Sequence, residues 1–162
     1  MRVSLVVRRH ACRMREFELK PLEGIPPVML GMGRAESRRA LKSPFRSLEK
    51  SSGALVDAYF EAAFQVFFAS DDTVEYIELS NHAGLSAFLF GRNVFATEAQ
   101  ALISWLAGRA ELSSEDGGYS YTSRELEVGL WRPVIPESPV DIEGRYFSSI
   151  GLGVAGYYAS AV

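Results

Sequence analysis

The chain has 162 residues, 48% of them hydrophobic and 23% charged, with a formal net charge of −3, which suits one globular domain and excludes disordered and collagen-like classes. Cys12 is the only cysteine, so an intrachain disulfide and CxxC metal or redox sites are excluded and a reducing compartment is favoured. The longest apolar runs, 62–69 and 85–90, are far shorter than a membrane-spanning helix, and no membrane association is expected.

The first 50 residues combine a basic N-terminus with a strand and a short helix. Residues 1–13 carry basic ends around an apolar run too short for a secretory signal, so we interpret them as a disordered extension and expect a cytoplasmic protein. Alternation over Glu16–Lys20 predicts a half-buried strand, and the prolines and glycine at 21–27 predict a loop. The helix formers of Arg34–Lys42 predict a basic helix that ends at Ser43-Pro44.

Strand patterns dominate the middle of the chain. Runs rich in β-branched and aromatic residues predict strands at Asp57–Phe60, Phe64–Phe68, Thr73–Leu79 and Ser86–Phe90. Between the second and third of these, Asp71-Asp72 stands where a hairpin turn is required. The alternative for the first run is a helix that continues from Ala54 through Ala63, because alanine, leucine and glutamate are common there.

The C-terminal half opens with the clearest helix. Ala99, Leu102, Ile103 and Leu106 recur at i, i+3, i+4 and i+7, which predicts a helix over 97–110 with one apolar stripe for packing on a sheet. After a turn at 115–118, strands are expected at Tyr119–Tyr121, Glu125–Trp131, Arg145–Leu152 and Val154–Ser160.

This series of elements predicts an α+β fold, an antiparallel sheet with short helices packed on one face. We expect a single domain over 14–162. The two helices have similar sequence patterns and each is followed by strands, so about 14–80 and 81–162 are candidate repeat halves.

No motif makes a credible active site. The glycines of 151–156 match GxGxxG, but only six residues follow them, so we interpret them as bends in a strand rather than a nucleotide loop. The pairs Asp71-Asp72 and Glu115-Asp116 are expected to cap turns. We therefore expect no enzyme activity, no cofactor and no metal site. The alternative is an enzyme or small-ligand protein that uses His82 with a carboxylate in a pocket between helix and sheet.

Charge is unevenly distributed along the chain. Residues 1–50 hold 12 Lys/Arg against 5 Asp/Glu, whereas residues 51–162 hold 5 against 15. Arg34, Arg38 and Lys42 fall on one helical face, a spacing that suits phosphate contacts. The acidic remainder would repel a duplex, so nucleic acid is disfavoured as a partner.

The second face of the predicted strands combines acidic and aromatic residues. Aromatic side chains supply binding area, and carboxylates steer and pair with a basic partner. The alternative is that the aromatic residues belong to the core. The candidate partner-binding residues are Glu75, Tyr76, Glu78, Glu125, Glu127 and Trp131.

Two sequence resemblances also point to binding. The run Leu30–Leu41, LGMGRAESRRAL, followed by Pro44, resembles the LGM-x-x-x-E-V-x-x-x-L-G-x-P signature of small bacterial domains similar to β-lactamase inhibitory protein and BamE-type outer-membrane assembly lipoproteins. It departs from that signature at Ser37 and Lys42-Ser43. The layout of about 15–158, with its Gly-Tyr-Tyr ending at 156–158, resembles uncharacterised bacterial immunity proteins of polymorphic toxin systems.

These resemblances imply a helical pair on an antiparallel sheet, repeated in tandem in the inhibitory protein, and supply no catalytic residue. We therefore expect a non-enzymatic protein-binding module, an immunity or inhibitor protein that neutralises a cognate toxin by binding a basic domain of it. A housekeeping protein remains a further alternative.

Overall fold

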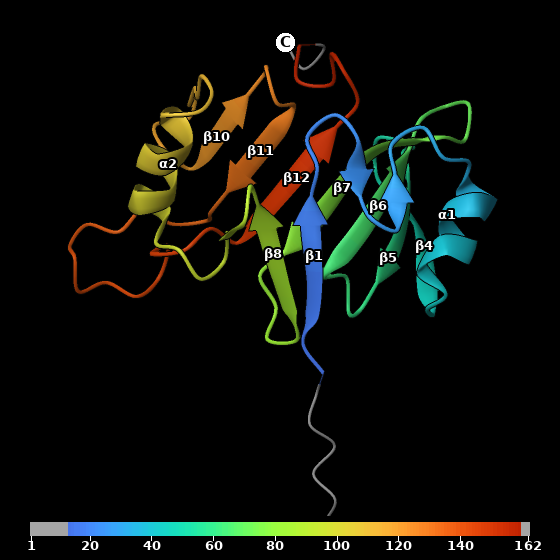
Figure 1. Ribbon diagram of the computed structural model, residues 1–162, viewed down its shortest axis with the longest axis horizontal. Coiled ribbons are helices and arrows are strands. Elements are labelled where there is room, and N and C mark those ends of the chain that lie inside the picture. Colours follow the sequence, from blue (N-terminus) through green and yellow to red (C-terminus); the bar gives the residue numbers. More distant parts are fainter. Residues whose placement is uncertain (1–12, 160–162) are drawn as a thin grey trace, which may run out of the picture.

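The computed structural model describes residues 13–159, so expectations for 1–12 and 160–162 lie outside the described residues. The fold is α+β with mainly antiparallel strands, as expected (Figure 1). The helices are α1 (Arg34–Leu41) and α2 (Ala99–Ala107). The strands are β1 (Arg15–Leu19), β2 (Gly24–Ile25), β3 (Val28–Met29), β4 (Phe45–Glu49), β5 (Leu55–Tyr59), β6 (Phe64–Phe68), β7 (Val74–Ser80), β8 (Leu85–Leu89), β9 (Arg92–Asn93), β10 (Ser120–Ser123), β11 (Val128–Trp131) and β12 (Ser149–Gly153).

A seven-stranded antiparallel sheet with the order β10-β11-β12-β7-β6-β5-β4 forms the body of the molecule. In front of it, β1 pairs in parallel with β8, which also pairs with the short β9 (Figure 1). Both helices pack on the same side as β1 and β8. We call this covered side of the large sheet the inner face, and the opposite side the outer face.

The hydrophobic core lies on the inner face, between the large sheet, the β1–β8 layer and α2. The apolar stripe predicted for α2 is confirmed, because Ala99, Leu102 and Leu106 are buried and Ile103 packs partly against the core. Burial of one leucine of this size stabilises the fold by roughly 1.5–3 kcal/mol. The largest fully buried side chains of the other elements are Leu19, Ile25, Tyr59, Phe64, Ile77, Leu79, Leu89, Phe147, Ile150 and Leu152.

Charged groups anchor α1 to the inner face. Arg38 donates from Nε to Asp57 Oδ2 (2.7 Å) and from Nη2 to Asp57 Oδ1 (2.9 Å), and the hydroxyl of Ser47 donates to the same carboxylate (2.7 Å). Arg34 pairs with Asp72. Two of the three basic side chains that could have contacted phosphate therefore form ion pairs within the protein.

Residues 54–63 form strand β5 and a turn, so the helical alternative for this segment is wrong. The turn to β6 passes through Phe60, Glu61 and Ala62 at φ of 51°, 58° and 66°. Left-handed backbone at a residue other than glycine costs on the order of 1 kcal/mol. Packing of the Phe60 ring against Phe17 and Phe64, with centroids 6.2 and 6.5 Å away, helps to offset that cost.

Both predicted acidic turns are confirmed. Asp71 Oδ1 accepts hydrogen bonds from the amide and hydroxyl of Thr73, which lower the pKa of Asp71. Asp116 Oδ1 accepts from the amide of Ser120 (2.8 Å) and the hydroxyl of Ser114 (3.1 Å). These bonds lower the pKa of Asp116 to about 2.

Three strand predictions near the C-terminus are wrong in extent, and one of them, 145–152, is found only as β12 from Ser149. β11 begins at Val128 rather than Glu125, because residues 124–127 form the turn from β10 and Glu127 takes a left-handed φ of 51°. β12 ends at Gly153, and 154–159 form turns instead of a strand.

The chain order of the elements repeats. The set β1, α1, β4–β6 is followed, after β7, by the set β8, α2, β10–β12, and the two sets of sheet strands lie on opposite sides of β7. The repeat halves 14–80 and 81–162 stay a prediction.

Candidate functional site

The outer face of the large sheet is covered by neither helix. Strand pairing aligns Gly151 of β12, Glu78 of β7 and Gln65 of β6 in one row across this face. Trp131 of β11 and Ser149 of β12 pair in the next row of the same face. The buried residues Val56, Ala58 and Tyr76 point to this face and are absent from the core cluster, whereas their neighbours Ile77 and Leu79 belong to the core. The outer face is therefore a surface separate from the core.

Three tyrosines cover one end of the outer face. We call Tyr76, Tyr157 and Tyr158 the tyrosine cluster. Tyr76 stacks on Tyr157 with ring centroids 4.6 Å apart, and its hydroxyl lies 3.0 Å from that of Tyr158. Gly129 and Gly151 leave the space that these rings occupy, because a Cβ at either position would collide with the ring of Tyr158 or Tyr76. Gly129 and Gly151 are thus strand residues that make room for aromatic rings. Of the glycines predicted to be bends in a strand, Gly151 and Gly153 lie in β12, whereas Gly156 lies in a turn.

Glu127 holds the C-terminal segment on the outer face. Its carboxylate accepts hydrogen bonds from the amides of Gly156 (2.8 Å) and Tyr158 (3.0 Å), and the residue is only 4% exposed. A buried carboxylate that accepts hydrogen bonds from two backbone amides has a structural role, because it holds those two segments together. Glu127 is therefore not available for a partner, and the prediction that it is a binding residue is wrong.

Replacing Glu127 by glutamine is expected to lower the free energy of unfolding by about 1–2 kcal/mol, since glutamine keeps one accepting oxygen and its NH₂ group leaves the other amide without an acceptor. Faster hydrogen exchange at Gly156 and Tyr158 would locate the effect. The matched control is Glu125→Gln in the same turn, at an exposed side chain, which should leave exchange unchanged. Equal exchange in the two variants would contradict this role.

Glu78 lies on the outer face beside the tyrosine cluster. Burial raises its pKa, and Lys50 opposes that rise. Burial, with the charges of Glu75 and Glu78, also raises the pKa of Tyr157. Glu78 is a carboxylate at the centre of an open sheet face, and a cation from a partner would favour its ionised form.

Trp131 is the large exposed aromatic residue of the outer face, with 46% of its surface accessible. It pairs with Ser120 of β10 on one side and Ser149 of β12 on the other. Beyond β10 lie carboxylates that border two surface cavities of about 280 and 350 Å³, together with Arg124, which pairs with Glu115. We call the carboxylate residues the acidic edge: Glu111, Glu115, Asp116 and Glu125.

The structure keeps part of the predicted binding set together. Trp131 and Glu78 share the outer face, and Glu125 lies on the acidic edge next to it. Tyr76 is 9% exposed and belongs to the tyrosine cluster, so it is not a contact residue. Glu75 is the extra residue of a β-bulge in β7. The sequence pattern missed Glu111 and Glu115, whose only signal was local negative charge.

At the opposite edge, the outer face ends in a largely apolar cavity of about 720 Å³ beside the left-handed turn at 60–62. The side chains of Arg46 and Glu61 are its charged members. Its apolar members are Pro44, Phe45, Leu48, Ala58, Phe60 and Ala62.

His82 meets a carboxylate, as the enzyme alternative requires, but the arrangement is unsuited to base catalysis. Its Nδ1 accepts a hydrogen bond from the amide of Gly84 (3.2 Å), and its Nε2 lies 3.1 Å from Glu61 Oε2. The neutral ring therefore carries its proton on Nε2 and donates it to Glu61. Both nitrogens are engaged, so neither is free to accept a proton from a substrate.

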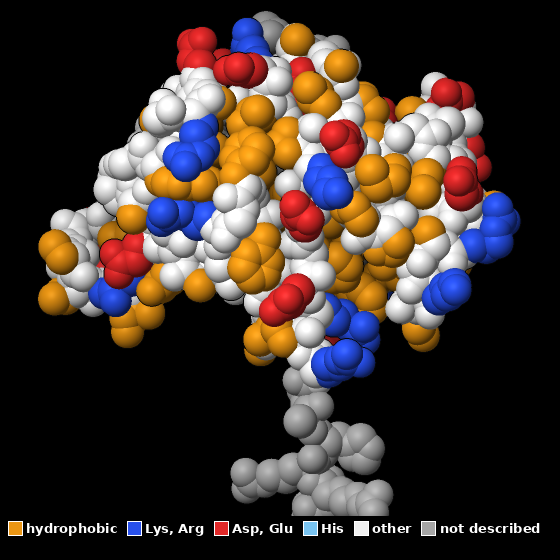
Figure 2. All heavy atoms as spheres, in the orientation of Figure 1, with side chains coloured by type: hydrophobic (Ala, Val, Ile, Leu, Met, Phe, Trp, Pro, Cys, Tyr) orange, Lys and Arg blue, Asp and Glu red, His pale blue; other side chains and the backbone are white. Residues whose placement is uncertain are grey.

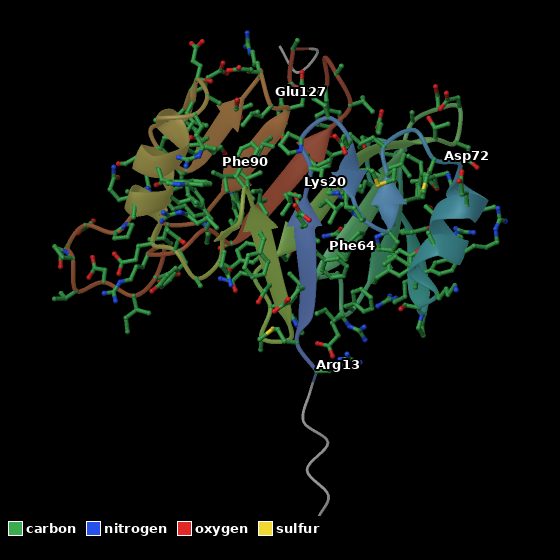
Figure 3. The ribbon with its side chains drawn as sticks, in the orientation of Figure 1. Arg13, Lys20, Phe64, Asp72, Phe90 and Glu127 are labelled. Carbon is green, nitrogen blue, oxygen red and sulfur yellow. The ribbon has the colours of Figure 1, made fainter. Side chains whose placement is uncertain are left out.

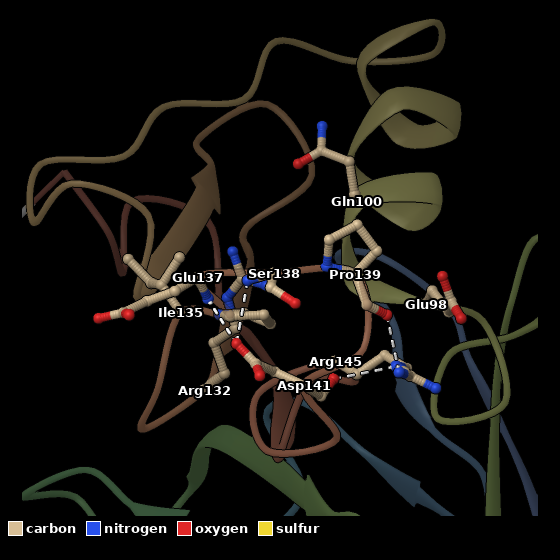
Figure 4. Close-up of a pocket in the computed structure, with 10 residues that line it drawn as sticks. Glu98, Gln100, Arg132, Ile135, Glu137, Ser138, Pro139, Asp141 and Arg145 are labelled. Atoms are coloured by element: carbon tan, nitrogen blue, oxygen red, sulfur yellow. Dashed lines mark hydrogen bonds between the residues drawn. The ribbon is translucent and has the colours of Figure 1, made fainter.

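A further cavity of about 390 Å³ lies between the loop 132–145 and the start of α2 (Figure 4). Buried Arg132 donates to the carbonyl oxygens of Gly118 and Gly144, both at 3.1 Å. Arg145 likewise binds two carbonyl oxygens of its own loop. Both guanidinium groups fix the loop. Three carboxylates line the cavity beside them, those of Glu98, Glu137 and Asp141. The cavity therefore favours neither an anion nor a cation.

Comparison of the chain with protein-family models, with curated proteins and with solved structures finds no match. Within residues 13–159, no helix is long and apolar enough to cross a membrane. The same residues contain no cluster of three or more His, Cys, Asp or Glu side chains suited to a metal ion.

Proposed function

We propose that this protein is a non-enzymatic binding module of the immunity or inhibitor type, which neutralises a toxin by binding a basic domain of it. The observation that carries the proposal is an open sheet face with exposed Trp131 next to an acidic edge. Tryptophan is enriched among the residues that dominate binding energy, and carboxylates around it accelerate encounter with a basic surface.

Several features of the molecule support a binding role. The acidic edge and the outer face are continuous through β10, whose Ser120 lies beside Trp131. The basic residues of α1 lie at the other end of the sheet order, where two of them are already paired internally. Both nitrogens of His82 are occupied, which supports binding over catalysis.

The experiment is co-expression with the product of the adjacent gene in a bacterial host. We expect the neighbouring product to arrest growth, this protein to restore it, and the two to form a stable complex. Absence of both a complex and growth rescue would overturn the proposal.

Charge reversal locates the surface. Glu115→Lys with Glu125→Lys is expected to weaken the complex about tenfold at low salt, mainly by slowing association, and Trp131→Ala to weaken it more than tenfold. The control is Glu49→Lys, a single charge reversal on exposed β4 at the opposite edge, to be compared per reversed charge. A Glu49→Lys effect as large as that of the acidic-edge variant would refute this assignment of the surface.

A further inference from the structure

A second group of aromatic and basic side chains lies on the inner side of the molecule, around α2 and the β8–β9 turn, with two members exposed and two half-buried. We propose that these residues bind an acidic, apolar-bearing segment of a protein partner. We call them the arginine–aromatic patch, and they are Phe90, Arg92, Trp105 and Arg109. The inference does not rest on the proposed function, because this patch and the outer face are separate surfaces.

Trp105 is the centre of the patch. It lies on α2 outside the fully buried stripe of that helix, is half-buried with part of its ring packed against the core, and is contacted by two guanidinium groups. The Cζ atoms of Arg92 and Arg109 lie 4.7 and 4.2 Å from its ring centroid, and the ring of Phe90 is 6.4 Å away. In the view of Figure 2, basic side chains border a hydrophobic area beside α2, and Figure 3 places Phe90 there.

Arg92 and Arg109 retain charge for a partner. Residues 51–162 contain only five basic side chains, and two of them converge on Trp105. Within residues 13–159, neither Arg92 nor Arg109 forms an ion pair, although Arg109 donates one hydrogen bond to the carbonyl of Trp105 (3.1 Å). By contrast, Arg124 pairs with Glu115. Stacking on the indole orients the two guanidinium groups, which reduces the entropy lost on binding.

Phe90 occupies a position that local preferences would give to asparagine. It is the first residue of a two-residue turn whose φ angles are 48° at Phe90 and 78° at Gly91, the geometry of a type I′ hairpin. Its side chain is 49% exposed and does not pack on the core. Among the aromatic rings of residues 13–159, its ring contacts only that of the half-buried Trp105, and a residue that violates a local rule for so small a packing gain is expected at a functional position.

The chemistry of the patch selects an acidic protein segment. Guanidinium groups form paired hydrogen bonds with carboxylates, and exposed Phe90, beside the accessible part of Trp105, offers apolar area to a neighbouring side chain of the same partner. In the small sheet, β8 lies between β9 and β1, and β1 carries Glu16 and Glu18. Because these two side chains would repel the carboxylates of the partner, those carboxylates should lie over β9 and α2. The excess of acidic residues in 51–162 disfavours nucleic acid, whose backbone needs several cations at once.

The test is selection of random 12-residue peptides displayed on phage against the full chain, followed by measurement of the enriched peptide. The variant Trp131→Phe leaves Trp105 as the only tryptophan, so its fluorescence reports on the patch. We expect enriched peptides with Asp or Glu around an aromatic or aliphatic residue, and saturable change of Trp105 emission.

Matched variants decide the outcome. Arg92→Gln with Arg109→Gln should weaken peptide binding at least tenfold, since two charge-assisted contacts are lost. Phe90→Asn should weaken binding without lowering the urea midpoint, because asparagine suits the turn. The control Arg124→Gln, at an exposed arginine already paired with Glu115, should leave binding unchanged.

Three results would overturn the proposal. The first is that no peptide is enriched. The second is that enriched peptides bind the Arg92→Gln, Arg109→Gln variant as tightly as they bind the unmodified protein. The third is that an oligo(dT) strand binds the patch as tightly as the peptide does. Peptides that depend on Trp131 instead would assign binding to the outer face and exclude the patch.

Discussion

Replacing Arg38 by methionine is expected to lower the free energy of unfolding by about 3–5 kcal/mol at pH 7, the cost of a buried charge without its partner. Asp57 is fully buried and receives its charged hydrogen bonds from Arg38. Burial alone would raise the pKa of Asp57, but the bonds from Arg38 and Ser47 outweigh it and the pKa is lowered. Methionine retains most of the packing of the side chain and removes only the charge and its donors.

The pH dependence tests the cause. A lowered pKa in the folded state means that the ion pair stabilises the wild type above the unfolded pKa of about 3.9, and that this stability is lost as the pH falls through the folded pKa. In the variant, Asp57 takes up a proton at higher pH. The difference between the two proteins should therefore shrink progressively below about pH 5 in urea titrations.

Arg39→Met is the control, because Arg39 is an exposed neighbour on the same helix. It should change the free energy of unfolding by no more than about 0.5 kcal/mol. Equal losses for the two variants would show that helix propensity, and not the ion pair, explains the effect.

Replacing Gly151 by alanine is expected to lower the free energy of unfolding by about 3 kcal/mol, near the upper end of overpacking costs. The new Cβ would collide with the hydroxyl and ring of Tyr76. That ring cannot withdraw easily, because Tyr157 stacks on it and Phe67 contacts its edge with centroids 5.4 Å apart.

A double-mutant cycle with Tyr76→Ala isolates the collision. The cost of Gly151→Ala should fall below about 1 kcal/mol when Tyr76 is absent, since contacting residues couple and the strand itself tolerates alanine. Gly108→Ala is the control, because its nearest neighbour is at an ordinary 3.5 Å. Additive effects in the cycle would disprove the role assigned to Gly151.

The sequence predicts elements whose signal is local. The stripe of α2 and the hairpins of β5–β7 follow periodicity and turn residues, and both are found. The residue at which β11 begins cannot be predicted from the local sequence alone. Alternation suggests a strand from Glu125, but the left-handed φ of Glu127 and its bonds to 156 and 158 turn the chain there.

The candidate sites depend on pairings that are distant in sequence. Arg34 and Arg38 look like free cations along the helix, and only the fold brings Asp72 and Asp57 to them. Trp131 emerges on an exposed sheet face as expected, whereas Tyr76 from the same pattern is covered by the C-terminal segment. Trp105 lies outside the apolar stripe of its helix, and the fold leaves it half-buried against the core and two arginines, which the sequence does not show.

The parallel pairing of β1 with β8 sets an order for folding during synthesis. Arg15–Leu19 pair with Leu85–Leu89, so β1 has no sheet partner until β8 has been synthesised. Phe17 and Leu19 stay exposed in the nascent chain for that time. Contacts so distant in sequence slow folding and expose apolar surface to aggregation. The N-terminal half is therefore not expected to complete its core before the C-terminal half is made.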